Sequence, residues 1–139
     1  MPALHVLQPP DWAAPKGYAN GIAVDLQPGM RLLFIGGQIG WNGQQQFESD
    51  DFIDQCRQAL ANVRSVLESG GSGPAGMARM TWYVTRRDEY NRRLRELGTV
   101  YREVMGRHFP AMTCVEVSAL MEARAQVEIE VTAVALPTP

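Results

Sequence analysis

Residues 49–71 form the most regular stretch of the sequence, and they predict a long helix with one apolar face. Ser49 is a good N-cap residue, and Asp50 and Asp51 fall in the first turn, where the helix dipole favours carboxylates. Gly70-Gly71 provides the C-terminal stop. Between these ends, apolar side chains recur at i, i+3 and i+4 spacing: Phe52, Ile53, Cys56, Ala59, Leu60, Val63, Val66 and Leu67. Because only one face of this helix is apolar, the rest of the chain must supply a second layer to cover it.

That second layer is predicted to be a sheet, because most of the other apolar segments are short or alternate at period two. Strands are expected at residues 3–7, 18–26, 30–38, 77–85, 112–120 and 125–135. Pro28-Gly29 is a turn signal that would join the second and third strands as a hairpin. A second helix is expected at 88–105, capped by Asp88 and closed by Gly106. The order predicts an α+β fold with two layers, in which a mostly antiparallel six-stranded sheet carries both helices on one face, in a single domain of residues 1–139.

The strand that follows Phe109-Pro110 has an unusual face. Pro110 has no N–H and fixes φ, so it ends the helical pattern before it. Period two then places Met112, Cys114, Glu116 and Ser118 in one row. We expect this row on the sheet face away from the helices, together with the last strand's Gln126, Glu128 and Glu130. Such a mixed face suits either a homo-oligomer interface around a polar pocket or an ordinary solvated sheet surface.

Composition and charge argue against several classes of function. The formal net charge of −2 leaves no basic footprint for nucleic acid, and the arginines at 86–95 are mixed with acidic residues. His5 and His108 have no metal-ligand spacing, so no metal site is expected. Cys56 and Cys114 suit free thiols in a reducing compartment, with Cys56 in the helix core. No apolar run is long enough to cross a membrane, and we expect a cytoplasmic protein with no membrane partner.

The residues alone suggest a pocket but no reaction. No nucleophile has a base at a recognisable spacing, and the phosphate-binding glycine loops are absent. Glu116, Glu128 and Glu130 are candidates for general acid–base chemistry if burial raises the pKa of one of them; otherwise each is a solvated strand carboxylate. Gly36-Gly37 marks either a bulge or a close approach of another group to the backbone. Cys114 is most simply an inert packed thiol.

Several blocks of the sequence resemble the reactive-intermediate deaminase family (RidA, also called YjgF). The more specific blocks are residues 109–117, Phe-Pro-Ala-Met-Thr-Cys-Val-Glu-Val, and residues 127–130, Val-Glu-Ile-Glu. Gly17-Tyr18, Gly36-Gly37-Gln38-Ile39 and Glu68-Ser69-Gly70-Gly71 match more weakly. Together the blocks span nearly the whole chain.

The resemblance implies a chorismate-mutase-like fold and a homotrimer, with helices outside, sheets around a central barrel and a small-molecule cleft between neighbouring subunits. In active members it implies hydrolysis of enamines and imines to a keto acid and ammonia, without a metal or an organic cofactor. An arginine of those members grips the substrate carboxylate through both of its oxygens. A glutamate of the last strand is associated with positioning the water.

Four positions of this chain carry over from the family. The glutamate falls on Glu128, the cleft thiol on Cys114 and the loop tyrosine on Tyr18. Gly36 stands where deaminases of the family often have serine. We therefore expect Glu128 as the catalytic residue, and Tyr18, Gly36, Cys114 and the residue at the arginine position, Met112, as the substrate-binding residues.

The arginine itself is missing. The usual Pro-Ala-Arg-Ser-Cys is Pro-Ala-Met-Thr-Cys at residues 110–114, so Met112 occupies the clamp position. A thioether cannot bind a carboxylate through two hydrogen bonds. The resemblance therefore points to an arginine-lacking branch of the family, unless Arg79 or Arg124 substitutes from another strand.

Three functions follow from these observations. The first is a hydrolytic deaminase of enamines or imines with altered specificity. The second is a non-catalytic trimer that binds a small apolar or aromatic ligand in a cleft made more apolar by Met112. The third, RNA cleavage, fits worst because the acidic chain lacks a basic groove.

Overall fold

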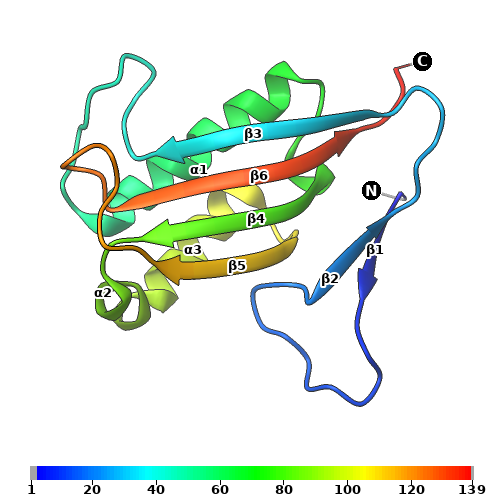
Figure 1. Cartoon of the computed structure of the whole chain (residues 1–139), viewed down its shortest axis with the longest axis horizontal. Helices are drawn as coiled ribbons and strands as arrows, with labels where there is room; N and C mark the ends of the chain where they lie inside the picture. The colour runs from blue at the N-terminus through cyan, green and yellow to red at the C-terminus, as the bar shows by residue number, and fades with distance from the viewer. Residues whose placement is uncertain (1–2, 139) are drawn as a thin grey trace.

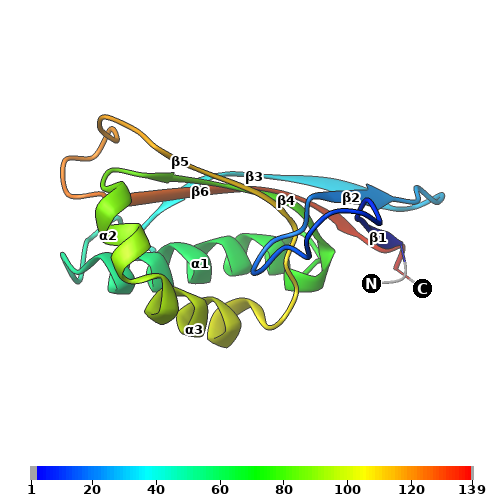
Figure 2. The ribbon, with the colours of Figure 1, turned by 90° about the horizontal axis from the view of Figure 1, so that it is seen from below.

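The computed structural model describes residues 3–138, and residues 1, 2 and 139 lie outside the described part. The helices are α1 (Phe52–Ser69), the short 3-10 turn η1 (Pro74–Gly76), α2 (Arg87–Arg92) and α3 (Leu94–Met105). The strands are β1 (Leu4–Leu7), β2 (Gly21–Val24), β3 (Arg31–Ile39), β4 (Met77–Val84), β5 (Ala111–Glu116) and β6 (Val127–Ala135). Seen from the side, the helices form one layer and the sheet the other (Figure 2). The predicted α+β arrangement in two layers is confirmed.

The prediction of one six-stranded sheet is wrong. A four-stranded sheet has the order β3-β6-β4-β5, and β1 and β2 form a separate antiparallel ribbon beside it (Figure 1). The predicted turn exists, because the Met30 N–H donates to the Gln27 carbonyl and Gly29 has φ +85°. Pro followed by Gly with positive φ is the pattern of a type II turn, whose twist splays the flanking strands apart. The turn therefore leads β2 away from β3, and β2 pairs with β1 instead.

β5 pairs parallel to β4, while the other neighbours in the sheet are antiparallel. Parallel neighbours need a long crossover, and α2 and α3 provide it. This pairing sets which side chains of β5 face the helices. Cys114 lies opposite Trp82, and Trp82 lies opposite Ile129, whose side chain is fully buried under the helices. Met112 and Cys114 therefore face the helix layer.

The prediction that the row from Met112 to Ser118 shares one face of the sheet with Glu128 and Glu130 is therefore wrong. Glu128 lies opposite Tyr83, which lies opposite Val115 on β5. These side chains share the sheet face away from the helices. Period two gives the alternation along β5, but its partner strand decides which set of residues turns toward the core.

The core lies between α1, α3 and the near face of the sheet. Leu60, Leu67, Met80 and Ile129 are among its fully buried side chains. Cys56 has no exposed surface, which confirms its predicted place in the core. Among residues 3–138, no helix is long and apolar enough to cross a membrane.

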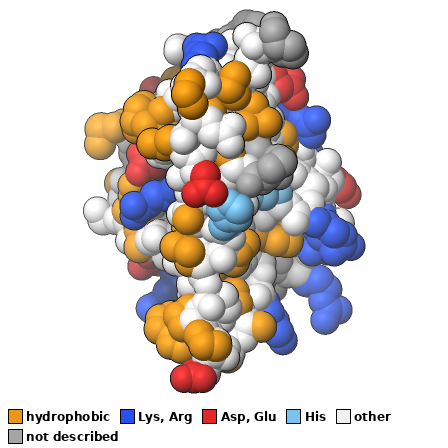
Figure 3. Space-filling model, turned by 90° about the vertical axis from the view of Figure 1, so that its right-hand side faces the viewer, with side chains coloured by type: hydrophobic (Ala, Val, Ile, Leu, Met, Phe, Trp, Pro, Cys, Tyr) orange, Lys and Arg blue, Asp and Glu red, His pale blue; other side chains and the backbone are white. Residues whose placement is uncertain are grey.

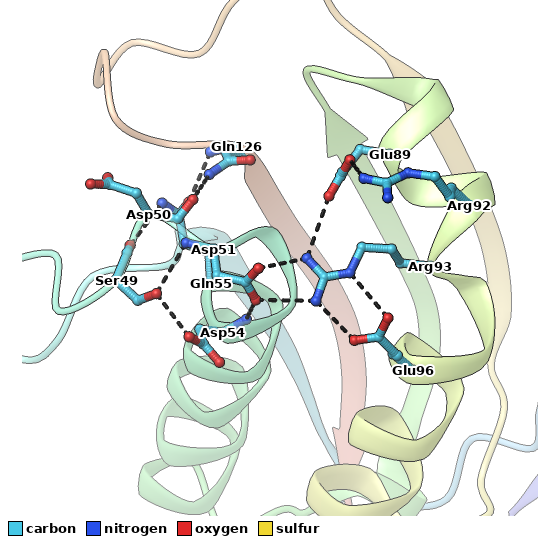
Figure 4. Close-up of polar contacts among 10 residues, drawn as sticks. All are labelled: Ser49, Asp50, Asp51, Asp54, Gln55, Glu89, Arg92, Arg93, Glu96 and Gln126. Carbon is cyan, nitrogen blue, oxygen red and sulfur yellow. Dashed lines mark hydrogen bonds and ion pairs between the residues drawn. The ribbon is translucent and has the colours of Figure 1, made fainter.

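The helix ends differ from the predicted caps. Asp51, not Ser49, caps α1 by accepting the Asp54 N–H at 3.2 Å, and the Ser49 hydroxyl accepts the Asp51 N–H. The predicted helix 88–105 is interrupted at Arg93, which separates α2 from α3. Figure 4 shows the Arg93 guanidinium lying between the carboxylates of Asp51, the N-cap of α1, Glu89 of α2 and Glu96 of α3. This junction holds the crossover helices against the start of α1.

Candidate functional site

A hollow of about 510 Å³ opens on the helix side of the sheet, between β5, α3 and the loop before β2. It brings together three of the predicted site residues, Tyr18, Met112 and Cys114. Met112 is half-buried against the core, whereas Tyr18 is 42% exposed. The walls are largely aromatic and apolar: Trp82, Tyr90, Leu94, Leu97, Tyr101 and Phe109. This composition suits the apolar body of a small ligand.

Cys114 belongs to this hollow and is not packed away. The residue is exposed in the single chain. Burial of its thiol nevertheless raises the pKa, and a hydrogen bond with Tyr90 partly offsets the rise. The same surroundings raise the pKa of Tyr90 to about 12, chiefly through burial. Because a raised pKa keeps the thiol protonated near neutral pH, Cys114 is not an activated nucleophile in this arrangement.

Gly36 lies on the opposite face of the sheet. It borders a second hollow, of about 550 Å³, with Arg79, Thr81, Tyr83 and Glu130. The Tyr83 hydroxyl donates a 2.6 Å hydrogen bond to Glu130, and this bond is the main cause of the raised pKa of Tyr83. The Tyr83 hydroxyl on β4 thereby fixes the position of the Glu130 carboxylate.

Glu128 lies beside the glycine pair at the end of β3. A β-carbon on Gly37 would collide with the Glu128 carboxylate where it now lies, so the glycine lets this carboxylate rest against the backbone of β3. The pairing of β3 with β6 also shifts register between Ile35 and Gln38. The glycine pair is therefore both a bulge and a place of close approach, and the group that approaches is Glu128.

The three candidate carboxylates have different partners. Glu116 accepts the Arg87 N–H at 2.8 Å and so caps the start of α2, which is a structural role. Glu130 accepts the Tyr83 hydroxyl. Within residues 3–138, the half-buried carboxylate of Glu128 accepts no hydrogen bond and forms no ion pair. Of the three, Glu128 is therefore the one whose two carboxylate oxygens both lack a partner among residues 3–138.

The predicted site residues thus form two half-sites on opposite faces of the sheet. Tyr18, Met112 and Cys114 line the helix-side hollow, while Gly36 and Glu128 lie on the far face. The single chain does not bring the two sets together.

Neither arginine considered as a substitute for the missing clamp reaches Met112. Arg79 lines the hollow on the far face of the sheet. Arg124 pairs with Asp50 at 2.9 Å and lies over the Phe47 ring. Both substitutions are therefore wrong for the single chain.

The sequence reasoning missed three cations, Lys16, Arg102 and Arg107, which line the helix-side hollow. They come from a loop, a helix and the segment after it, so no spacing links them. Gly98, in the middle of α3, was the one available signal, because glycine is unfavourable inside a helix. In the described part of the chain, no group of three or more His, Cys, Asp or Glu side chains is placed to hold a metal ion.

Comparison with known proteins gives the family. The sequence matches the family described as Endoribonuclease L-PSP over residues 12–135. A RutC family protein from Pasteurella multocida is 32% identical over 114 residues, which cover 82% of this chain and 84% of the relative. A Rid-family protein of unknown function from Yersinia pestis, YyfB, has a crystal structure similar to this chain, with TM-score 0.80 and 27% identity over 94% of this chain and 98% of that one. The chain belongs to the RidA/YjgF (Rid) family.

The Rid family includes relatives with a named activity. The human protein named 2-iminobutanoate/2-iminopropanoate deaminase is 26% identical over 123 residues, which cover 88% of this chain and 81% of the relative. The predicted resemblance is therefore confirmed at the level of the family and the fold.

Proposed function

We propose that this Rid-family chain is a hydrolase of small enamines or imines, with a specificity altered by Met112. The proposal is supported by the relatives named as imine deaminases. The observation that carries it is the uncommitted carboxylate of Glu128, because Glu116 and Glu130 are each bound to another group. A carboxylate free of other partners can orient a water molecule and take up its proton.

The reaction needs only water and the substrate. Glu128 accepts a proton from the attacking water while the water oxygen bonds to the imine carbon. Proton transfer to the nitrogen then allows ammonia to leave, and the carbon is released as a ketone. The balance is one C=N bond and one water consumed, and one C=O bond and one ammonia formed. An enamine enters the same sequence after protonation to its imine.

We further propose a homotrimer in which the far-face half-site of one chain completes the helix-side hollow of its neighbour. The sheet face away from the helices exposes apolar side chains that a partner would cover: Leu32 is 55% exposed, Phe34 75% and Val115 42%. Further apolar side chains, including Val6 and Trp12, are exposed near the β1–β2 ribbon, and Figure 3 shows hydrophobic groups over this end of the molecule. An interface over the sheet would bring Gly36 and Glu128 to a second chain.

Substitution of Glu128 tests the reaction. Glu128→Gln keeps the size of the side chain and removes the base, so we expect the rate of keto-acid formation to fall by about 100-fold or more. The assay generates imines from several amino acids with a PLP enzyme and follows the keto acid. Glu122→Gln, an exposed change in the loop before β6, is the matched control and keeps the wild-type rate. Equal rates for Glu128→Gln and wild type, or no acceleration by wild type with any imine, would contradict the proposal.

A binding protein without catalysis is the second candidate. It is favoured by the helix-side hollow itself, whose lining contains no carboxylate and no histidine that could act as a base. In that case aromatic ligands raise the melting temperature, and the wild-type protein turns over none of the imines in the assay. Turnover lost in Glu128→Gln would decide against it.

RNA cleavage is not favoured, although the family description names an endoribonuclease. The formal net charge of −2 gives RNA no electrostatic attraction. RNA cleavage that co-purifies with the protein and disappears in Glu128→Ala would reverse this judgement.

A further inference from the structure

The helix-side hollow has a one-sided charge. Three basic residues line it, Lys16, Arg102 and Arg107, and no aspartate or glutamate does. Among residues 3–138, none of the three forms an ion pair. The carboxylate nearest to Arg102 in sequence, Glu103, is taken by Arg57 at 2.5 Å. No carboxylate of residues 3–138 therefore pairs with the three positive charges at this hollow.

The Arg102 side chain lies along α3 at the edge of the hollow. A β-carbon on Gly98, one turn earlier in the helix, would lie 3.2 Å from the Arg102 Nη1 atom. The guanidinium thus folds back over Gly98, and Gly98 itself lines the hollow. Glycine is costly inside a helix, and here it leaves the space that the guanidinium occupies.

The remaining lining is apolar. Tyr101 and Phe109 stack with their ring centroids 5.4 Å apart, and Met112 and Leu97 continue the apolar wall. A hollow with aromatic walls and cations along its lining is suited to a ligand with an apolar body and one anionic group.

We propose that the helix-side hollow binds a small organic carboxylate with an apolar body of aromatic size. Arg102 and Arg107, assisted by Lys16, hold the carboxylate, and the aromatic walls with Met112 hold the body. Charge complementary to a substrate carboxylate thus comes from α3 and the segment after it instead of from β5. The inference rests on the proposed function, because that function makes this hollow the ligand cleft. It narrows the substrate class to imines or enamines that carry a carboxylate and a bulky apolar group.

The test compares two ligands that differ only in charge. Isothermal titration calorimetry measures the binding of 3-phenylpropanoate and of its neutral amide, 3-phenylpropanamide, at low ionic strength. The full-length wild-type protein is compared with Arg102→Gln/Arg107→Gln. The control is Arg95→Gln, which removes an exposed arginine from the same helix outside the hollow. Thermal melts establish that all three proteins are folded.

We expect wild type and Arg95→Gln to bind the carboxylate at least about tenfold more tightly than the amide. The double variant loses this preference while its affinity for the amide stays unchanged. Added salt weakens the binding of the carboxylate only, because exposed charges are screened. The proposal is overturned if neither compound binds wild type, if the amide binds as well as the carboxylate, or if the folded double variant keeps the preference.

The outcomes also separate this inference from the proposed reaction. If the preference for the carboxylate depends on the two arginines but the protein turns over no imine, the binding site is supported and the proposed reaction is ruled out. If wild type and the double variant turn over imines with the same KM, the proposed reaction is supported and the anion site is ruled out.

Discussion

Met112 is the residue whose chemistry departs furthest from an imine deaminase that clamps a carboxylate. Its side chain faces the helix-side hollow from β5, half-buried against the core. A thioether contributes dispersion and a weak acceptor, and it donates no hydrogen bond to an anion. The part of the hollow formed by β5 therefore favours an apolar part of a ligand. The basic residues of the hollow come from other elements.

Introducing an arginine at position 112 tests whether Met112 limits the binding of a carboxylate. Met112→Arg adds a bidentate donor within the hollow, and charge-assisted hydrogen bonds contribute about 1.5–3 kcal/mol. We expect kcat/KM for the imine of a small amino acid, such as 2-iminopropanoate, to rise about 10- to 100-fold. The measurement is the coupled keto-acid assay. Met112→Leu keeps the wall apolar and serves as the control, with little change. A variant that folds and gains nothing on the small substrate would show that position 112 does not contact it.

The junction of α2 and α3 is the element that holds the helix layer to the start of α1. Arg93 donates to Asp51 at 2.6 Å and to Glu96 at 2.8 Å, while Asp51 also caps α1. The hydrogen bond from Arg93 lowers the pKa of Asp51 and of Glu96. Hydrogen bonding to Arg92 is the main cause of the lowered pKa of Glu89. Arg93, the residue at which the helix is interrupted, thus joins α2 and α3 to the N-cap of α1 through one guanidinium (Figure 4).

Acid should weaken this junction. A carboxyl with a lowered pKa in the folded state stabilises the protein above its unfolded pKa, and the stabilisation is lost as the pH falls through the folded value. We expect Asp51→Ala to lower the free energy of unfolding at pH 7 by about 0.5–2 kcal/mol, as for the loss of an N-cap. The difference from wild type shrinks as the pH falls below about 4, because Asp51 of the unfolded chain then takes up a proton while the lowered pKa keeps the folded carboxylate ionised to lower pH.

Urea unfolding at pH 7 and pH 3 measures this difference. Asp11→Ala, in an exposed loop, is the control and leaves the stability unchanged at both values. A penalty for Asp51→Ala that is equally large at pH 3 would show that the ionised carboxylate is not responsible.

At the scale of the whole molecule, the sequence predicts elements better than their partners. The helix at 49–71 is found as α1 because its pattern depends only on neighbours in sequence. The interruption at Arg93 carries no glycine or proline and was missed. The alternation of Met112 and Cys114 along β5 was right, but the face was wrong because it depends on parallel pairing with β4. Arg102 and Arg107 were missed because their approach to the hollow is set by tertiary structure.

The topology of the sheet explains why the predicted site residues do not come together in one chain. Glu128 and Cys114 lie on opposite faces of one sheet, which separates the carboxylate from the hollow that would hold a ligand. Two copies arranged around a symmetry axis can bring these faces together. The central claim is therefore that the catalytic cleft is shared between neighbouring subunits.

Subunit complementation tests this claim most directly. Glu128→Gln removes the carboxylate from one half-site, and Cys114→Trp fills the other. Each variant alone is expected to be inactive in the imine assay. Oligomers assembled from an equal mixture should regain about a quarter of the wild-type rate, because about one cleft in four then receives both intact halves. A mixture of Glu128→Gln with the double variant Glu128→Gln/Cys114→Trp is the control and stays inactive. Equal mixtures that remain as inactive as their parents, although they co-assemble, would contradict a shared cleft.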